Sequence, residues 1–156
     1  MDTELFTSAS EDDTHSIAAH FAAHLQPGDV VALSGELGAG KTEFVRGICN
    51  YFHVEDIVTS PTFSIINLYH GQTKSSESLR IVHVDLYRLK NKQELQTIGL
   101  DEWLALPDAI KLIEWPEKAN GTLNMQHYHI TIWTLPGLEE RRQIQIAVVP
   151  ALSMVT

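Results

Sequence analysis

The sequence has a single cysteine, few basic residues and no long apolar run. Cys49 has no second cysteine with which to form a disulfide inside the chain, and its neighbours are largely apolar. This context favours a buried thiol in a reducing compartment over a catalytic nucleophile. No stretch approaches the ~20 consecutive apolar residues that cross a bilayer, and the N-terminus is acidic where a secretion signal would be basic. We therefore expect a cytoplasmic protein without a membrane partner.

Positive charge is also scarce. Lysines and arginines together number 11 against 20 acidic residues, which gives a net charge of −9 and a pI near 5.2. A surface with this balance repels nucleic acid over long range. If RNA is involved in the function, we expect a partner protein to hold it.

The length and the hydrophobic content indicate one domain that comprises residues 1–156. The 156 residues are 44% hydrophobic, which is enough for one well-buried core and short for two. No repeat, low-complexity tract or domain linker interrupts the chain.

The first third of the chain predicts a helix, a strand and a second helix. Apolar residues recur every four positions between about 11 and 25, behind Ser10 as an N-cap. The continuous apolar run at 30–33 is typical of a strand that is buried on both faces. A second helix follows from about 42 to 52.

The remainder predicts a sheet of mixed direction. Strand-like runs at 63–68 and 79–85 are joined by a polar linker that is too short for a parallel crossover, so this pair should be antiparallel. The other predicted elements are one or two short helices within 92–105, broken near Gly99, a buried strand at 110–114 and a terminal hairpin at about 127–148. These elements predict an α/β fold with a mixed (parallel and antiparallel) sheet flanked by helices.

The segment GELGAGKT joins the first predicted strand to the second helix and matches the P-loop pattern GxxxxGK[ST]. It consists of Gly35, Glu36, Leu37, Gly38, Ala39, Gly40, Lys41 and Thr42. Its glycines let backbone N–H groups turn toward phosphate oxygens, and the helix N-terminus adds a partial positive charge. Lys41 would reach the β- and γ-phosphates, and the Thr42 hydroxyl would bind Mg²⁺. The alternative is a glycine-rich turn that binds nothing, against which the strand and helix on either side argue.

Two acids are candidates to complete such a site. Asp85 ends the apolar run Ile81–Val84, and Glu114 ends a second apolar run, so each acid is delivered to the end of a strand. A P-loop enzyme needs a carboxylate near the magnesium ion and a group that positions the attacking water. Either acid could instead cap the following helix, and the spacing does not separate their roles.

Four motifs in this order resemble the TsaE family, formerly YjeE. They are GELGAGKT, SPTF at 60–63, HVDLYRL at 83–89 and LIEWPEK at 112–118, and the resemblance extends from about residue 8 to residue 148. It implies a P-loop NTPase-like fold and an ATPase required for threonylcarbamoyladenosine modification of tRNA. It further implies ATP and Mg²⁺ as ligands, the TsaB and TsaD proteins as partners, and contact with tRNA only indirectly through their complex.

The resemblance also assigns roles to the motif residues. It implies that Lys41 and Thr42 bind phosphate and magnesium, that Glu114 lies in the magnesium shell and that Asp85 is needed for hydrolysis. Thr62 resembles a switch threonine that senses the γ-phosphate, although an ordinary Ser-Pro turn is the alternative for its segment.

The resemblance extends to two weaker matches. Trp115 offers an indole face to the nucleotide or is simply packed, and both readings stay open. The 8–14 stretch resembles a segment that lies beside the adenine.

Arginines are few, and this bears on the rate of hydrolysis. None of the five lies in a flexible loop with a clear path to the γ-phosphate, and Arg88 is the nearest by motif. An arginine finger is worth about 10³ to 10⁵ in rate in enzymes that have one. We therefore expect low intrinsic ATPase activity in isolation, with a partner supplying or organising what is missing.

Two other functions stay open at this stage. A small-molecule kinase shares the P-loop but normally needs an acceptor pocket and a lid, for which the segment between the second helix and SPTF is short. A nucleotide-gated binding protein would use its bound state, and not its turnover, as the output. Hydrolysis measured with and without partners distinguishes the ATPase from the gated binder, and phosphate on an acceptor would indicate the kinase.

Overall fold

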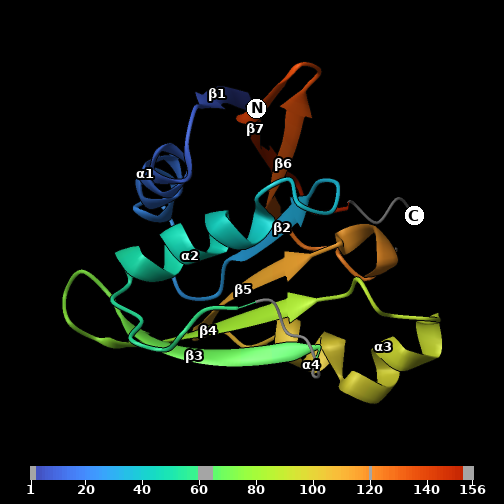
Figure 1. The fold of residues 1–156 in the computed structure, drawn as a ribbon. Coiled ribbons are helices and arrows are strands. Elements are labelled where there is room, and N and C mark those ends of the chain that lie inside the picture. Colours follow the sequence, from blue (N-terminus) through green and yellow to red (C-terminus); the bar gives the residue numbers. More distant parts are fainter. Residues whose placement is uncertain (1–2, 60–64, 120, 153–156) are drawn as a thin grey trace.

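A seven-stranded sheet forms the centre of the computed structural model, which describes residues 3–59, 65–119 and 121–152. The strand order is β1-β7-β6-β2-β5-β4-β3 (Figure 1). The strands are β1 (Thr3–Ser8), β2 (Val30–Ser34), β3 (Ile66–Gln72), β4 (Ser78–Asp85), β5 (Ala109–Glu114), β6 (His127–Leu135) and β7 (Leu138–Val149). The helices are α1 (Glu11–Ala22), α2 (Lys41–Tyr51), α3 (Lys92–Ile98), α4 (Leu100–Leu104) and the 3₁₀ helix η1 (Pro116–Ala119).

The middle of the sheet is parallel and its edges are antiparallel. Strand β2 pairs in parallel with β5 and β6, and β5 pairs in parallel with β4. The β3–β4 and β6–β7 hairpins and the β1–β7 pair are antiparallel. The expected mixed α/β sheet is therefore confirmed, including the antiparallel pair joined by the short polar linker. Because β2, β4 and β5 run in one direction, their carboxyl ends lie along the same edge of the sheet.

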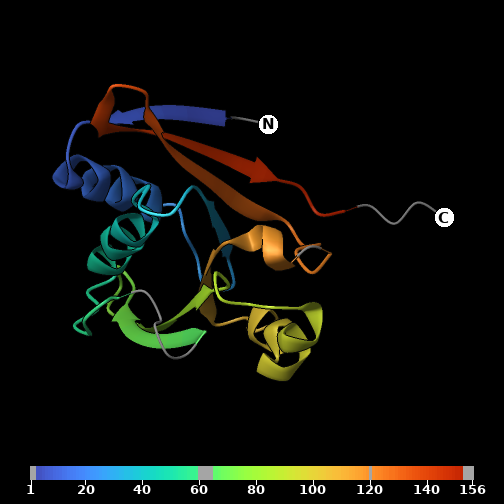
Figure 2. The same cartoon turned by 45° about the vertical axis from the view of Figure 1, so that its right-hand side comes forward.

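Helices cover both faces of the sheet. Helices α1 and α2 lie on one side, and α3 and α4 lie on the other (Figure 2). The first layer encloses a core that includes Phe44 and Ile48 of α2, and the second encloses a core that includes Leu95 and Leu100. Strands β2 and β5 lie between these cores, and all six residues of β5 are buried, with Lys111 and Glu114 as its two charged members. Because helices cover both faces of the sheet, most residues of these two strands are apolar, and apolar and polar residues do not alternate along them.

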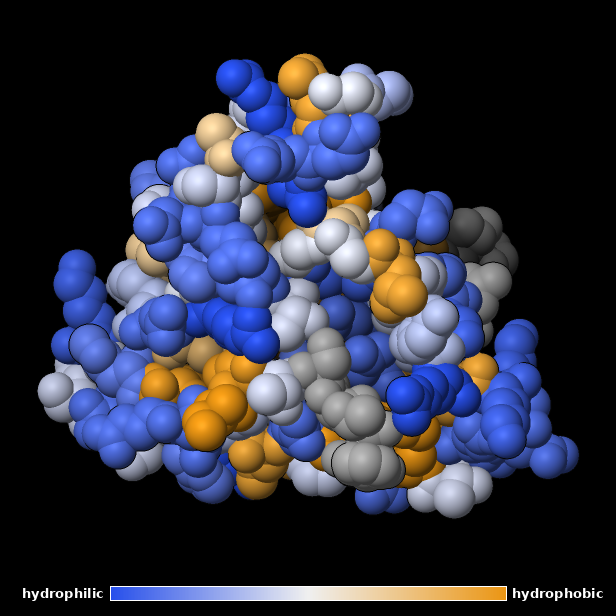
Figure 3. Space-filling view, in the orientation of Figure 1, coloured by the Kyte–Doolittle hydropathy of each residue, from blue (hydrophilic) through white to orange (hydrophobic). Residues whose placement is uncertain are grey.

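The outer surface differs from these cores. On the face shown in Figure 3, hydrophilic side chains predominate and apolar ones form separate patches. Within the described residues, no helix is long and apolar enough to cross a membrane.

Helix α1 begins where the sequence predicts and ends earlier. The Ser10 side chain accepts a hydrogen bond from the backbone N–H of Asp13 at 3.1 Å, as an N-cap does. The helix ends at Ala22, three residues before the expected boundary, because the chain turns there and the N–H of Leu25 bonds to the carbonyl of Ala22 at 3.0 Å. Leu25 is buried all the same. The apolar period therefore identified a buried side chain beyond the true end of the helix.

The structure confirms one further prediction and contains one strand that the sequence did not predict. The expected helix break is confirmed at Gly99, whose φ of 69° ends α3 and begins α4. Strand β1 was not expected, because most of its side chains are exposed and its sequence has no clear apolar alternation. Its pairing is supplied by β7, with Thr3 opposite Ala147 and Ser8 opposite Arg142.

Candidate functional site

The GELGAGKT segment forms the connection between β2 and α2, at the sheet edge where the parallel strands end. Two of its glycines are required by geometry. A Cβ on Gly35 would lie 2.5 Å from the carbonyl oxygen of Ile132 in β6, which is closer than any side chain tolerates. Gly40 is the N-cap of α2 with a φ of 111°, a conformation that other residues rarely adopt. The loop backbone therefore lies tightly against β6 before it enters the helix.

Lys41 lies at the centre of the site. Its side chain is buried, and its Nζ donates to the carbonyl of Gly35 and, at 3.2 Å, to that of Glu36. The same Nζ lies 4.0 Å from the ring centroid of Trp115, within cation–π distance. Burial lowers the pKa of Lys41, and the nearby carboxylates, with Glu114 first and Asp85 second, oppose that effect. The cost of burying the charged ammonium group of Lys41 is thus offset by the nearby carboxylates.

The two candidate acids are direct neighbours. Asp85 and Glu114 are register partners at the ends of β4 and β5, and Leu33 of β2 is the register partner of Glu114 on the other side. Both acids therefore lie along the same strand ends as the loop that follows β2. The structure brings together what the sequence placed in three separate segments.

The surroundings of the two acids differ. Glu114 is buried, and its Oε2 lies 2.6 Å from Nε2 of His83. Asp85 is half-buried, and its Oδ1 accepts a hydrogen bond from the backbone N–H of Tyr87 at 3.0 Å. Burial raises the pKa of Asp85, and the hydrogen bond from Tyr87 acts in the opposite direction. One carboxylate is thus fixed by a buried side chain, and the other is closer to solvent with a weakened preference for the ionised form.

Trp115 is both packed and turned toward the loop. Its ring lies 5.0 Å from that of Tyr87 and contacts the core on the α3 side of the sheet. Its face is also next to the Nζ of Lys41. Its φ of 58° is unusual for an aromatic residue and places the chain in a left-handed turn directly after Glu114. The two readings of Trp115 left open by the sequence are therefore not exclusive in their geometry.

The other predicted residues take different positions. Thr42 is half-buried in the first turn of α2, Ala39 is buried, and Leu37 at the tip of the loop is 70% exposed. Gly38, with a φ of 81°, has open space around the position of a Cβ. Thr62 lies outside the described residues.

The 8–14 stretch contributes buried polar groups. Ser8 and Thr14 are both buried, and their hydroxyl oxygens lie 2.7 Å apart. The Ser8 hydroxyl also donates to the carbonyl of Ser10 at 2.7 Å. These hydrogen bonds join the end of β1 to the first turn of α1.

Arg142 is a residue of the site that the sequence analysis did not single out. Its Nε donates to the carbonyl of Ala39 at 2.9 Å, so a guanidinium from β7 is bonded to the loop. Its other described contacts are with the carbonyls of Glu139 and Arg141. The contact joins residues 103 positions apart. No local motif marks it, and only the position of β7 in the sheet reveals it.

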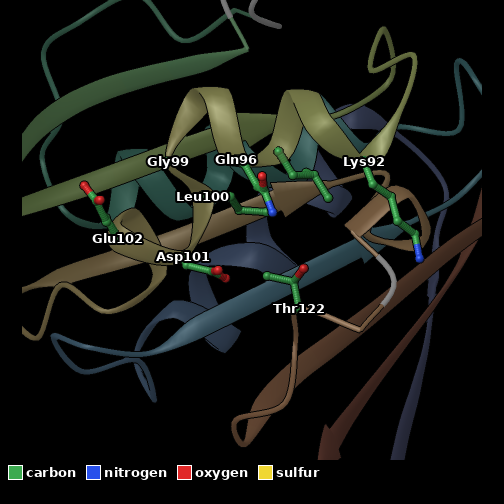
Figure 4. Close-up of a pocket in the computed structure, with 8 residues that line it drawn as sticks. Lys92, Gln96, Gly99, Leu100, Asp101, Glu102 and Thr122 are labelled. Atoms are coloured by element: carbon green, nitrogen blue, oxygen red, sulfur yellow. The ribbon is translucent and has the colours of Figure 1, made fainter.

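A separate pocket lies away from this loop. It has a volume of about 340 Å³ and is formed by α3, α4 and Thr122, with Lys92, Gln96 and Asp101 among its lining residues (Figure 4). None of its lining residues belongs to the GELGAGKT segment or to the acid pair. A smaller pocket of about 220 Å³ begins at Ser34, next to the loop, and continues to His127 and His129.

The described residues contain no group of three or more His, Cys, Asp or Glu side chains that could hold a metal ion by themselves. Magnesium does not require such a group, because it is usually bound by one or two protein oxygens together with substrate phosphates and water. Thr42 and Glu114 offer oxygens of this kind. The donor set therefore suits magnesium bound together with a phosphate ligand, and not a structural metal.

Known proteins resemble this chain in sequence and in structure. The family model for the threonylcarbamoyl adenosine biosynthesis protein TsaE matches residues 8–144. The tRNA threonylcarbamoyladenosine biosynthesis protein TsaE of Rickettsia bellii is 44% identical over 109 residues, or 69% of this chain and 71% of that protein. The Bacillus subtilis protein of the same description is 35% identical over 125 residues, or 80% and 74%. A crystal structure of Bacillus subtilis YdiB has a TM-score of 0.73 and 29% identity, covering 93% of this chain and 84% of that one.

Proposed function

Since this chain belongs to the TsaE family of tRNA threonylcarbamoyladenosine biosynthesis proteins, we propose that it is a magnesium-dependent ATPase that drives or resets the TsaB–TsaD modification complex. The observation that carries the proposal is the position of Lys41. It begins α2 directly after the glycine-rich loop, and its buried charge is supported by acids from two neighbouring strands. A cation held there is suited to bind the phosphates of a nucleotide.

The residues of the site fit ATP and magnesium. The tight approach of Gly35 to β6 and the left-handed Gly40 shape the loop backbone in front of the α2 N-terminus, where N–H groups and the helix dipole favour an anion. Thr42 and Glu114 would hold the magnesium ion. When bound, the ion would neutralise charge on the β- and γ-phosphates.

The chain's own residues divide the remaining work. Lys41 would exchange its bonds to the carbonyls of Gly35 and Glu36 for charge-assisted bonds to phosphate oxygens. Asp85, whose pKa is raised by burial, would orient the attacking water and accept a proton from it. The switch role of Thr62 rests on the family resemblance.

The proposed partners and the slow turnover have separate support. Family membership supports TsaB and TsaD as partners, and tRNA would be met only through them because the chain carries a net charge of −9. Arg142 is half-buried and donates to the loop carbonyl of Ala39 and to the carbonyl of Glu139 in its own strand, so it is held in place and is not a mobile finger. We therefore propose that isolated turnover is slow and that the complex increases it.

Replacement of Lys41 tests the proposal. Lys41→Ala is expected to weaken ATP binding in the presence of magnesium by at least about tenfold, since the backbone alone cannot neutralise phosphate charge. Isothermal titration calorimetry measures this, with Lys74→Ala in the exposed β3–β4 turn as a matched control. Unchanged ATP affinity in a folded Lys41→Ala chain would sink the assignment.

The reaction itself distinguishes the alternatives. Phosphate release that rises when TsaB and TsaD are added supports an ATPase of the complex. Binding of ATP to the complex without turnover would indicate a nucleotide-gated binding protein, and transfer of phosphate to an acceptor would indicate a kinase.

A further inference from the structure

A series of side-chain contacts connects the buried acid Glu114 to the backbone carbonyl of Thr59. Its central member is His83 of β4, which is fully buried and lies two residues before Asp85. His83 belongs to the HVDLYRL motif, but the proposed function gives it no task. A histidine buried in this way must be satisfied by partners, and these partners point toward the site.

One contact in this series is short and the other two are long. Nε2 of His83 lies 2.6 Å from Oε2 of Glu114 across the β4–β5 pair. Nδ1 of His83 lies 3.4 Å from the Tyr69 hydroxyl, which in turn lies 3.3 Å from the carbonyl oxygen of Thr59. By distance, the bond to Glu114 is strong and the contacts of Tyr69 are weak.

The hydrogen atoms that these groups can donate also indicate that the contact between His83 and Glu114 is stronger than the contacts of Tyr69. An ionised carboxylate only accepts hydrogen bonds, so Nε2 of His83 carries the hydrogen that is shared with Glu114. With a neutral ring, Nδ1 is then an acceptor. The Tyr69 hydroxyl has one hydrogen for two acceptors, Nδ1 and the Thr59 carbonyl, and can satisfy only one at a time. The bond from His83 to Glu114 does not depend on that choice.

We propose that His83 is a positioning residue for magnesium binding, because it fixes the carboxylate of Glu114. With Oε2 held by His83, the carboxylate keeps one orientation and has its second oxygen for the cation. Ligating carboxylates that are hydrogen-bonded in this way lose about 10- to 100-fold in metal affinity when the supporting group is removed. The proposal rests on the proposed function, since it takes Glu114 as a magnesium ligand.

Two amide substitutions test this with little change in polarity. The side-chain amide of Gln reaches about as far as Nε2 of histidine, so His83→Gln can still donate to Glu114. The shorter Asn side chain in His83→Asn cannot. A role in packing alone would affect both variants alike, whereas a positioning role separates them.

The measured quantity is the effect of magnesium on nucleotide affinity. For each folded variant, the Kd for ATP is determined by calorimetry in EDTA and in excess MgCl₂, and the ratio of the two values is compared. We expect His83→Asn to lower this ratio by at least about tenfold, with the EDTA value changed by less than about threefold. His83→Gln should keep the ratio within about threefold of wild type. Equal ratios in all three chains, or equal losses in both variants, would overturn the proposal.

Two further measurements keep the outcome clear. In a Glu114→Gln background, His83→Asn should have no additional effect on the ratio, and an undiminished effect would contradict the link between the two residues. Tyr69→Phe, which removes only the hydroxyl, should change the ratio by less than about threefold because its contacts are long. A loss as large as that of His83→Asn would overturn the ranking given above. Wild-type protein that binds no ATP at all, or binds it equally with and without magnesium, would instead refute the proposed function.

Discussion

At the scale of single residues, the site combines charges that the fold does not favour. Lys41 is buried, and Asp85 is partly removed from water beside a second acid. Such groups cost stability and persist where a bound ligand uses them. Substitution of these residues should therefore change the free energy of unfolding of the free protein.

Asp85→Asn is expected to stabilise the free protein while it slows hydrolysis. Burial raises the pKa of Asp85 above the value of 3.8 for the unfolded chain, so the folded state binds this proton more tightly. As the pH rises from the pKa of Asp85 in the unfolded chain through its higher pKa in the folded protein, ionisation of Asp85 therefore lowers the free energy of unfolding. Asparagine removes the charge and keeps an acceptor for the N–H of Tyr87.

Thermal unfolding across pH measures the effect of Asp85→Asn. The melting temperature of the variant should exceed that of wild type at pH 7, and the difference should shrink as the pH falls toward 4. In a chain of this size, each kcal/mol corresponds to about 2 to 4 °C. A variant that is less stable than wild type at pH 7 contradicts the argument.

Arg142→Lys is expected to weaken ATP binding modestly. The substitution keeps the charge but removes the Nε donor that bonds to the carbonyl of Ala39 at 2.9 Å. A hydrogen bond of this kind is worth about 0.5 to 1.5 kcal/mol, which corresponds to about 2- to 12-fold in affinity if the loop loosens accordingly. Calorimetric titration of ATP compares it with Arg141→Lys, an exposed neighbour whose substitution should have no effect. Equal affinities in the two variants would show that the bond does not support the loop.

At the scale of elements, helices α1 and α2 pack closely against each other. A Cβ added to Gly47 would lie 2.6 Å from the Cβ of Ala18 and 3.0 Å from the backbone of His15. The same two helices are also joined by His15 of α1, whose Nε2 lies 2.7 Å from Oε2 of Glu43 in α2. Helix α2, which follows the glycine-rich loop, is therefore held closely by α1.

Gly47→Ala is accordingly expected to destabilise the protein despite the better helix propensity of alanine. Overpacking of this kind costs about 1 to 3 kcal/mol. Chemical denaturation measures it, and Asn50→Ala at an exposed position of the same helix is the control, with an expected change within about 0.5 kcal/mol. If Gly47→Ala is as stable as wild type, the helices can separate without cost.

The elements that the sequence predicted well are those with a strong local pattern. The buried strands β2 and β5 are mainly apolar, with Lys111 interrupting β5, and the loop between β2 and α2 matches a motif with fixed spacing. These patterns also located Lys41 and both acids. Strand β1 has no such pattern, since its exposed side chains alternate weakly and its pairing is set by β7.

The parts of the site that escaped prediction depend on strand order. The bond between His83 and Glu114 exists because β4 and β5 are neighbours in register, and the bond between Arg142 and Ala39 exists because β7 passes near the loop. Neither follows from residue spacing. Thr62 lies outside the described residues, so its role stays a prediction.

At the scale of the whole molecule, the most informative property is the negative net charge. The net charge of −9 is spread over a surface that, on the face in Figure 3, is mostly hydrophilic. Proteins that bind nucleic acid alone usually present clustered basic residues. The charge balance therefore supports the proposal that this chain meets tRNA only through partner proteins.

We expect the isolated chain to show no binding of tRNA at physiological salt. Fluorescence anisotropy of labelled tRNA, titrated with the chain alone and then with TsaB and TsaD present, measures this. A chain that binds tRNA alone, with an affinity that falls as salt is raised, would contradict the expectation, because that salt dependence indicates direct phosphate contacts.

The pairing of β1 with β7 also bears on the order in which the protein assembles during synthesis. The ribosome releases β1 well before it makes the hydrogen-bonding partner of that strand, Arg142–Ala147 of β7. A contact between segments so distant in sequence forms late, because the intervening chain must first be ordered. Arg142 arrives with the same strand, and with it the bond to Ala39. A nascent chain thus exposes β1 without its partner strand, and the GELGAGKT loop without its bond to Arg142, until β7 has emerged.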